Sequence, residues 1–101
     1  MRLSRHALER FVERFAAEPA LAAAELRRVL IRTRRLGRNP RSGAIAVLAL
    51  YRGRLLVVLV QHATCMTVLT WPQFVPRLAE FGRARVPRRW GRLVRRLAGN
   101  A

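Results

Sequence analysis

Residues 6–14 place an imidazole, two guanidiniums and a carboxylate at helical spacing. At 100° per residue, His6, Arg10, Glu13 and Arg14 fall within about a quarter turn of one another. The opposite side of the same helix is apolar and carries Leu8, Phe11, Val12 and Phe15. Imidazole transfers protons near neutral pH, and guanidinium binds phosphate oxygens. This pattern predicts a helix that buries its apolar side. Its polar side would bind a negatively charged ligand, with RNA as the first candidate, and supply a proton-transfer group to it.

Metal-free acid–base chemistry on a phosphate ester fits these residues best. RNA supplies its own nucleophile, the 2′-OH, so an enzyme has only to position it, move protons and stabilise negative charge. His6 would move the proton, and Arg10 and Arg14 would bind the phosphate. Glu13 lies three residues after Arg10, where it can orient that guanidinium or itself serve as the base. The prediction is an endoribonuclease that needs no metal and no cofactor.

Other kinds of site find little support in the sequence. One cysteine and two histidines are too few for a structural zinc site, and the five acidic residues, all glutamate, are scattered. A Gly-rich phosphate loop with a lysine is missing as well. Cys65 and His62 are three residues apart, which puts them on opposite faces of an extended strand and argues against a thiol protease.

The charge balance points to a polyanionic partner. The 101 residues carry a net charge of +16, and all 21 basic residues are arginine. A GC-rich coding sequence can explain why arginine replaces lysine, but it does not explain the excess of cation over acid. Nucleic acid, an anionic membrane surface and an acidic protein are the candidate partners. The longest apolar stretch, 44–60, is interrupted by Arg52-Gly53-Arg54, so neither half can cross a bilayer as a helix, and a cytoplasmic protein is expected.

Two helices are expected in the first third of the chain. Ser4 can cap a helix that runs to about residue 17, and Pro19 can open a second that runs to about Leu36, where Gly37 would end it. The outer side of the second helix carries three residues predicted to bind nucleic acid: Arg28, Arg32 and Arg35. The basic loop 38–43 contains two more, Arg38 and Arg41. It reads either as a solvated turn or as a flap over a phosphate backbone.

Three strands are expected next. Residues 44–51 and 54–60 are apolar on both faces and flank Arg52-Gly53, a two-residue hairpin signal. Residues 65–71 read as a third strand, closed by a proline. Thr70 in this strand is either a phosphate-binding hydroxyl or a simple strand former, and Trp71 either stacks on a base or packs in the core.

The last third is predicted to be helical. Residues 74–81 and 87–98 each gather apolar side chains on one side, with 83–86 as a linker. The outer side of the last helix carries Arg88 and Arg92, predicted RNA contacts, although a solvated face or membrane-surface binding also fits. The fold class expected is α+β: two N-terminal helices packed on a small antiparallel β-meander, followed by C-terminal helices, in a single domain 1–101.

The motif Ser4-Arg-His6-Ala7-x-x-Arg10-x-x-Glu13-Arg14 resembles the first helix of small toxin-like domains in the RelE, barnase and colicin-type ribonuclease superfamily. Those domains often read T/S-x-H-A-x-x-R-x-x-x-R there, followed by a second helix and a meander with a V-x-T-V/L element. Cys65-Met66-Thr67-Val68-Leu69-Thr70 stands at that element, so the resemblance spans about 3–71 and leaves 73–98 as an extension. It implies metal-independent RNA cleavage by a toxin-like protein that acts on RNA or the ribosome. An acidic antitoxin or immunity protein would be its partner.

Two function classes lead, and a third, association of residues 87–98 with a membrane surface, is the weakest of the three. One is a toxin-like endoribonuclease centred on His6, Arg10, Glu13 and Arg14. The other is a non-catalytic module that binds nucleic acid or an acidic protein, since the arginines spread over several predicted elements.

Overall fold

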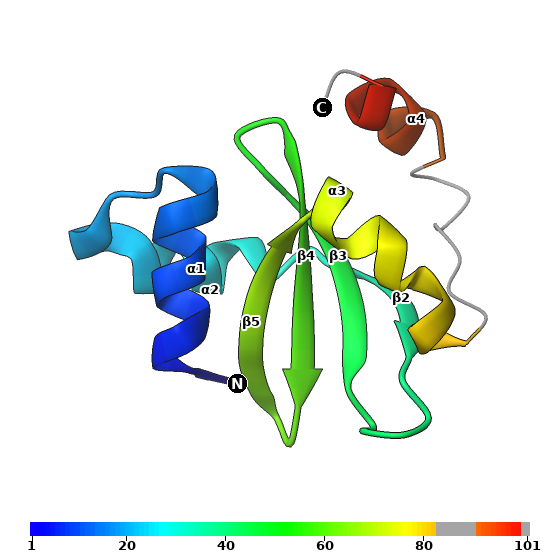
Figure 1. Ribbon diagram of the computed structural model, residues 1–101. Helices are drawn as coiled ribbons and strands as arrows, with labels where there is room; N and C mark the ends of the chain where they lie inside the picture. The colour runs from blue at the N-terminus through cyan, green and yellow to red at the C-terminus, as the bar shows by residue number, and fades with distance from the viewer. Residues whose placement is uncertain (83–90, 100–101) are drawn as a thin grey trace.

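The computed structural model describes residues 1–82 and 91–99 and places a five-stranded sheet between two groups of helices (Figure 1). The strand order is β1-β5-β4-β3-β2. β1 runs parallel to β5, and the other neighbours are antiparallel. The strands are β1 (Arg2–Leu3), β2 (Arg34–Arg38), β3 (Ile45–Tyr51), β4 (Arg54–Gln61) and β5 (Thr64–Thr70). The predicted α+β class, with helices, then a meander, then helices, is confirmed.

The strands of the central meander are joined by two short turns, one of which the sequence predicted. Arg52 and Gly53 have φ values of 48° and 75°, so the predicted two-residue turn joins β3 to β4. A left-handed backbone suits Gly53, which lacks a Cβ. His62 and Ala63, with φ values of 51° and 57°, make a similar turn from β4 into β5. These tight turns set the register at which each pair of strands begins, and an irregularity between Leu59 and Val60 then shifts the β4–β5 pairing by one residue.

One face of the sheet is covered by α1 (Arg5–Phe15) and α2 (Ala22–Val29). The Ser4 side chain accepts a hydrogen bond of 2.9 Å from the Ala7 amide and caps α1 as predicted. Phe11 is fully buried and meets the Tyr51 ring of β3 edge-on, with 4.8 Å between the ring centroids. The apolar side of α1 is therefore the side that packs on the sheet.

The other face is covered by segments that follow β5 (Figure 1). These are α3 (Trp71–Phe74), the 3₁₀ helix η2 (Val75–Phe81) and α4 (Gly91–Gly99). Phe74, Phe81 and Val94 are buried in one cluster with Leu48 and Val57 of the sheet. Cover on both faces explains why residues 55–59 of β4 are all buried and why the strand sequences lack an apolar–polar alternation.

The predicted second helix is too long. A 3₁₀ turn η1 (Pro19–Leu21) precedes α2, the helix ends at Val29, and residues 34–38 form β2 beside β3. Gly37 pairs with Ala46 in this strand and does not cap a helix. The predicted shared helix face of Arg28, Arg32 and Arg35 is therefore wrong. Arg28 lies on α2, Arg32 in the turn and Arg35 on β2.

Smaller differences occur around the meander. The short parallel strand β1 was not expected, and β5 ends at Thr70, so that Trp71 begins α3. The expected helix 74–81 is mostly 3₁₀, with Pro76 in its first turn. The predicted linker 83–86 and the start of the predicted last helix, including Arg88, lie outside the described residues. Within residues 1–82 and 91–99, each helix is too short or too polar to cross a bilayer.

Candidate nucleic-acid interface

Helix α1 lies along the outer edge of β5, and its polar side chains bind that edge. The Ser4 hydroxyl donates to the Met66 carbonyl over 3.0 Å, and Arg14 Nη1 donates to the Val68 carbonyl over 2.7 Å. β1 pairs with β5 only at Thr64 and Cys65, so the rest of β5 is an edge of the sheet. The Met66 and Val68 carbonyls would otherwise face solvent there. The two hydrogen bonds thus set where α1 sits along β5, and they hold Arg14 near the end of that strand.

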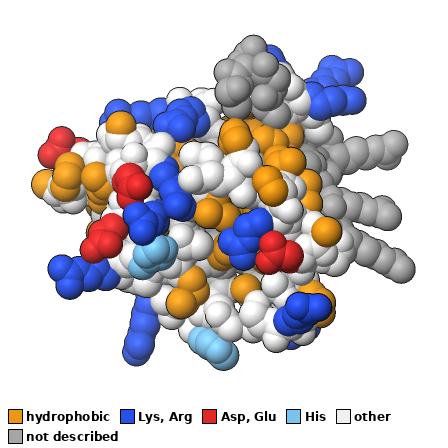
Figure 2. Space-filling model, in the orientation of Figure 1, with side chains coloured by type: hydrophobic (Ala, Val, Ile, Leu, Met, Phe, Trp, Pro, Cys, Tyr) orange, Lys and Arg blue, Asp and Glu red, His pale blue; other side chains and the backbone are white. Residues whose placement is uncertain are grey.

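The predicted polar residues form a row along α1. Arg10 pairs with Glu13, as the spacing predicted, and their side chains are 34% and 60% exposed. His6 is exposed one turn before Arg10. Figure 2 shows basic side chains and a histidine together over α1, with acidic side chains among them. His6 and Arg14 are eight residues apart, or about 12 Å along the helix, so the four side chains make a row and not a single cluster.

Arg54 at the start of β4 extends this row and was missed in the sequence. Its Nη1 donates to the Arg14 carbonyl over 3.1 Å, and its Cζ lies 4.6 Å from the centroid of the Phe15 ring. The signal for it was its position in β4, because side chains two residues apart in a strand point to the same face of the sheet. Leu56 and Val58 pack toward α1, so Arg54, two residues before Leu56, shares their face.

Thr70 lies beside Arg54 because of strand register. Thr70 pairs with Leu56, which places it diagonally next to Arg54 at the end of the sheet. Its hydroxyl accepts from the Gln73 amide at 3.3 Å, while its own amide donates to Gln73 Oε1 at 2.9 Å. This reciprocal cap fixes the hydroxyl, which still has its proton to donate.

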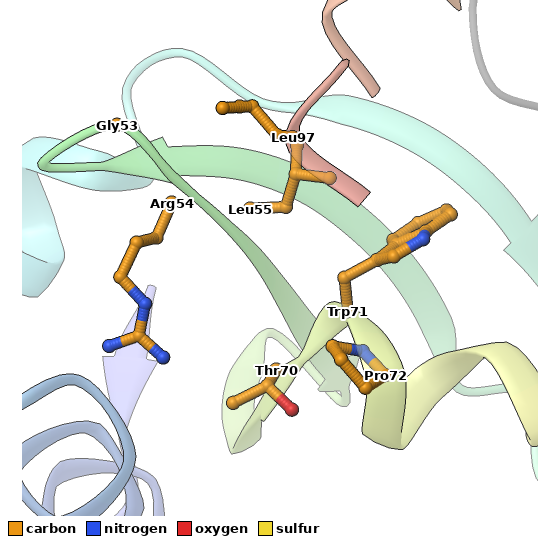
Figure 3. Close-up of a pocket in the computed structure, with 7 residues that line it drawn as sticks. All are labelled: Gly53, Arg54, Leu55, Thr70, Trp71, Pro72 and Leu97. Carbon is orange, nitrogen blue, oxygen red and sulfur yellow. The ribbon is translucent and has the colours of Figure 1, made fainter. Parts of the chain in front are cut away.

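A pocket of about 520 Å³ opens at this end of the sheet (Figure 3). Arg54, Thr70 and Trp71 line it, and Leu97 of α4 closes part of it. We call His6, Arg10, Arg14, Arg54 and Thr70 the α1–β5 surface, and the cavity at its end the end pocket. The structure thus joins Arg14, Arg54 and Thr70, with Arg10 and His6 one and two turns away.

The other predicted contacts lie elsewhere. β2 forms the sheet edge opposite β5 and β1, and the arginines on or near it are exposed: Arg28, Arg32, Arg35, Arg38 and Arg41. Asn39 Oδ1 accepts from the Arg41 amide at 2.8 Å, and Gln61 Nε2 donates to the Ser42 carbonyl at 2.7 Å. The loop 38–43 is therefore a turn held by hydrogen bonds of its own and by one from Gln61 of β4. Arg92 is exposed on α4.

The remaining titratable groups have structural surroundings. The Tyr51 hydroxyl donates to Glu25, and this bond together with burial raises the pKa of Tyr51 above its usual value of 10. Arg52 lies 3.7 Å from the same carboxylate, so the group joins α2 to the β3–β4 turn. Burial raises the pKa of the Cys65 thiol to about 11, while His62 is exposed in a turn. No group of three His, Cys, Asp or Glu side chains suited to a metal occurs in the described part of the chain.

Comparisons with known proteins add no assignment to this geometry. No protein-family model matches the sequence, and neither a curated protein nor a solved structure matches the chain.

Proposed function

We propose that this protein is a small basic RNA-targeting protein that binds RNA across the α1–β5 surface and cleaves it without a metal. The observation that carries the proposal is the grouping of Arg14, Arg54 and Thr70 at the end of a row that begins at His6. A row of about 12 Å along α1 is long enough to contact more than one phosphate of an RNA strand. The resemblance of the 4–14 motif to ribonuclease toxin domains points the same way.

Arg10 marks the position for the scissile phosphate, since it lies one helical turn from both His6 and Arg14. In the proposed reaction the His6 imidazole accepts the 2′-OH proton and the 2′-oxygen attacks phosphorus. The P–O5′ bond breaks, and the departing 5′-oxygen takes a proton from solvent. The products are a 2′,3′-cyclic phosphate and a 5′-hydroxyl end. Arg10 and Arg14 stabilise the charge that develops on the phosphoryl oxygens, with Glu13 positioning the Arg10 guanidinium.

This mechanism predicts a specific block by 2′-O-methylation. Unmodified single-stranded RNA incubated with the protein and excess EDTA should be cut, leaving cyclic phosphate ends. The same oligonucleotide methylated at every 2′-oxygen should bind and stay intact, because its nucleophile is gone. The measurement is denaturing gel electrophoresis with end-group analysis. RNA that stays intact in EDTA would reject the catalytic proposal, and cutting of the methylated strand would reject the 2′-OH route.

A second candidate function, non-catalytic nucleic-acid binding, is favoured by the exposed arginines along the β2 edge. Arg35 and Arg38 are exposed on β2, which forms the edge of the sheet opposite the edge along which α1 lies. Each phosphate neutralised releases counterions, so a binding face there contributes to the salt dependence of affinity. An acidic protein, as the toxin resemblance implies, would bind the same cationic face.

For this candidate, the variant Arg35→Ala/Arg38→Ala should lower the slope of log K against log salt by about 1.4, from about 0.7 per phosphate contact. The probe is fluorescent 2′-O-methyl RNA, titrated at several salt concentrations. Arg5→Ala is a matched control because Arg5 is 94% exposed and paired with Glu9 on a different side of α1. An unchanged slope in the double variant would remove the β2 edge from the interface.

A further inference from the structure

The end pocket has two chemically different walls. Trp71, Leu55, Pro72 and Leu97 supply apolar surface, while Arg54 and Thr70 supply hydrogen-bond donors. Figure 3 shows Arg54 on one side of the opening and Trp71 on the other, with Thr70 and Pro72 between them. A volume of about 520 Å³ lies within the range of small-molecule pockets, roughly 300–1,000 Å³. The pocket therefore suits a ligand that is flat and apolar at one end and anionic at the other.

The aromatic wall is held in place before any ligand arrives. Trp71 is the first residue of α3, whose start is fixed by the reciprocal Thr70–Gln73 cap. Its ring lies 6.1 Å from the ring of the fully buried Phe74. Trp71 itself is only partly buried. A pre-positioned ring with exposed area binds a flat ligand at low conformational-entropy cost.

The polar wall is also fixed. Arg54 is anchored by its bond to the Arg14 carbonyl and by its contact with Phe15, which together account for one N–H and one face of the guanidinium. A guanidinium has five N–H donors, so others can bind an anion. Thr70 lines the same pocket, with its hydroxyl held toward α3 by the Gln73 amide and its methyl group on the Arg54 side (Figure 3). Arg54 and Trp71 line one pocket, so a single ligand inside it can contact both.

We propose that the end pocket is a nucleotide subsite that takes one unpaired base against Trp71 and the attached phosphate at Arg54. The inference rests on the proposed function, since the ligand is a nucleotide of the RNA bound along α1. Only an unstacked base can enter such a pocket, so the subsite favours single-stranded RNA over duplex. The subsite extends the α1–β5 surface. That surface by itself binds phosphates and has no preference among bases.

The test uses tryptophan fluorescence and uncleavable RNA. The sequence has two tryptophans, so Trp90→Phe leaves Trp71 as the single reporter. Titration with a 2′-O-methyl tetranucleotide should quench the emission saturably. A matched tetranucleotide with one abasic position should bind about 5- to 150-fold more weakly, the usual share of one stacked base. Trp71→Ala should lose this difference, and Trp71→Phe should retain most of it.

Outcomes for the subsite and for cleavage are separable. Because 2′-O-methyl RNA cannot be cut, a base-dependent affinity supports the subsite even when the protein leaves unmodified RNA intact. Equal affinity for the normal and abasic strands, with no quenching, overturns the subsite even when cleavage in EDTA succeeds. The abasic comparison uses intact Trp71, so it stands even when Trp71→Ala fails to fold.

Discussion

Replacing His6 by alanine is expected to slow RNA cleavage in EDTA by about 10²- to 10⁴-fold, the usual contribution of a general acid–base group. His6 is the one imidazole on the α1–β5 surface and lies one turn from the proposed phosphate position at Arg10. Its side chain is exposed, so its removal leaves α1 packed on the sheet. Affinity for 2′-O-methyl RNA should therefore change little. Two quantities are measured for each variant: the single-turnover cleavage rate and the dissociation constant for the uncleavable 2′-O-methyl RNA.

The other histidine provides the matched control. His62 is exposed in the β4–β5 turn and is not one of the residues of the α1–β5 surface, so His62→Ala should cut at the rate of the unaltered protein. Arg5→Ala tests the same helix half a turn around from Arg14. If His6→Ala cleaves as fast as the unaltered protein, His6 is not the proton-transfer group. A loss of rate that only tracks a loss of affinity would make His6 a binding residue.

Local signals in the sequence were sufficient for α1 and the meander. Ser4 caps α1 as its residue type predicts, and Arg52-Gly53 forms the expected turn. The apolar stretches on either side of that turn are strands buried on both faces. In each case the deciding interaction lies within a few residues along the chain, which is where residue spacing carries information.

Residues 30–38 could not be assigned that way. Val29, Leu30 and Leu36 fit a helical period, yet Leu36 is buried in β2 at a register shift between Arg35 and Gly37. A five-residue edge strand with one buried side chain and a bulge has no clear alternation to recognise. The strand forms because β3 offers a free edge for pairing. That edge exists only in the folded sheet, so the sequence of residues 34–38 alone does not reveal it. The two-residue β1 depends in the same way on β5.

In the candidate site, too, contacts between residues close in the sequence could be predicted, and contacts that depend on tertiary packing could not. The polar row lies on one helix, so His6, Arg10 and Arg14 could be grouped from spacing alone. Arg54 required the hairpin register and the face of β4 to be combined. The bond from Arg14 to the Val68 carbonyl joins residues 54 positions apart, so it follows only from how α1 docks on β5. The end pocket likewise depends on α3 and α4, which fold over one face of the sheet and meet the β3–β4 hairpin at its end.

Phe11→Ala should lower the free energy of unfolding by about 3–5 kcal/mol, as is usual for a buried phenylalanine. Phe11 is fully buried, and its ring contacts Tyr51 and lies 6.1 Å from the Phe15 ring. The truncation leaves a cavity between α1 and the sheet, and it also removes an edge-to-face aromatic pair. Urea denaturation followed by circular dichroism measures the loss.

Leu21→Ala serves as the control, since Leu21 is 53% exposed and its truncation should change stability by less than about 0.5 kcal/mol. A loss below about 1 kcal/mol for Phe11→Ala would contradict tight packing of α1 on the sheet. That outcome would also weaken the functional proposal, because α1 carries His6, Arg10 and Arg14. Their distance from Arg54 and Thr70 is set by the same packing, so loosening α1 separates the polar row from the end pocket.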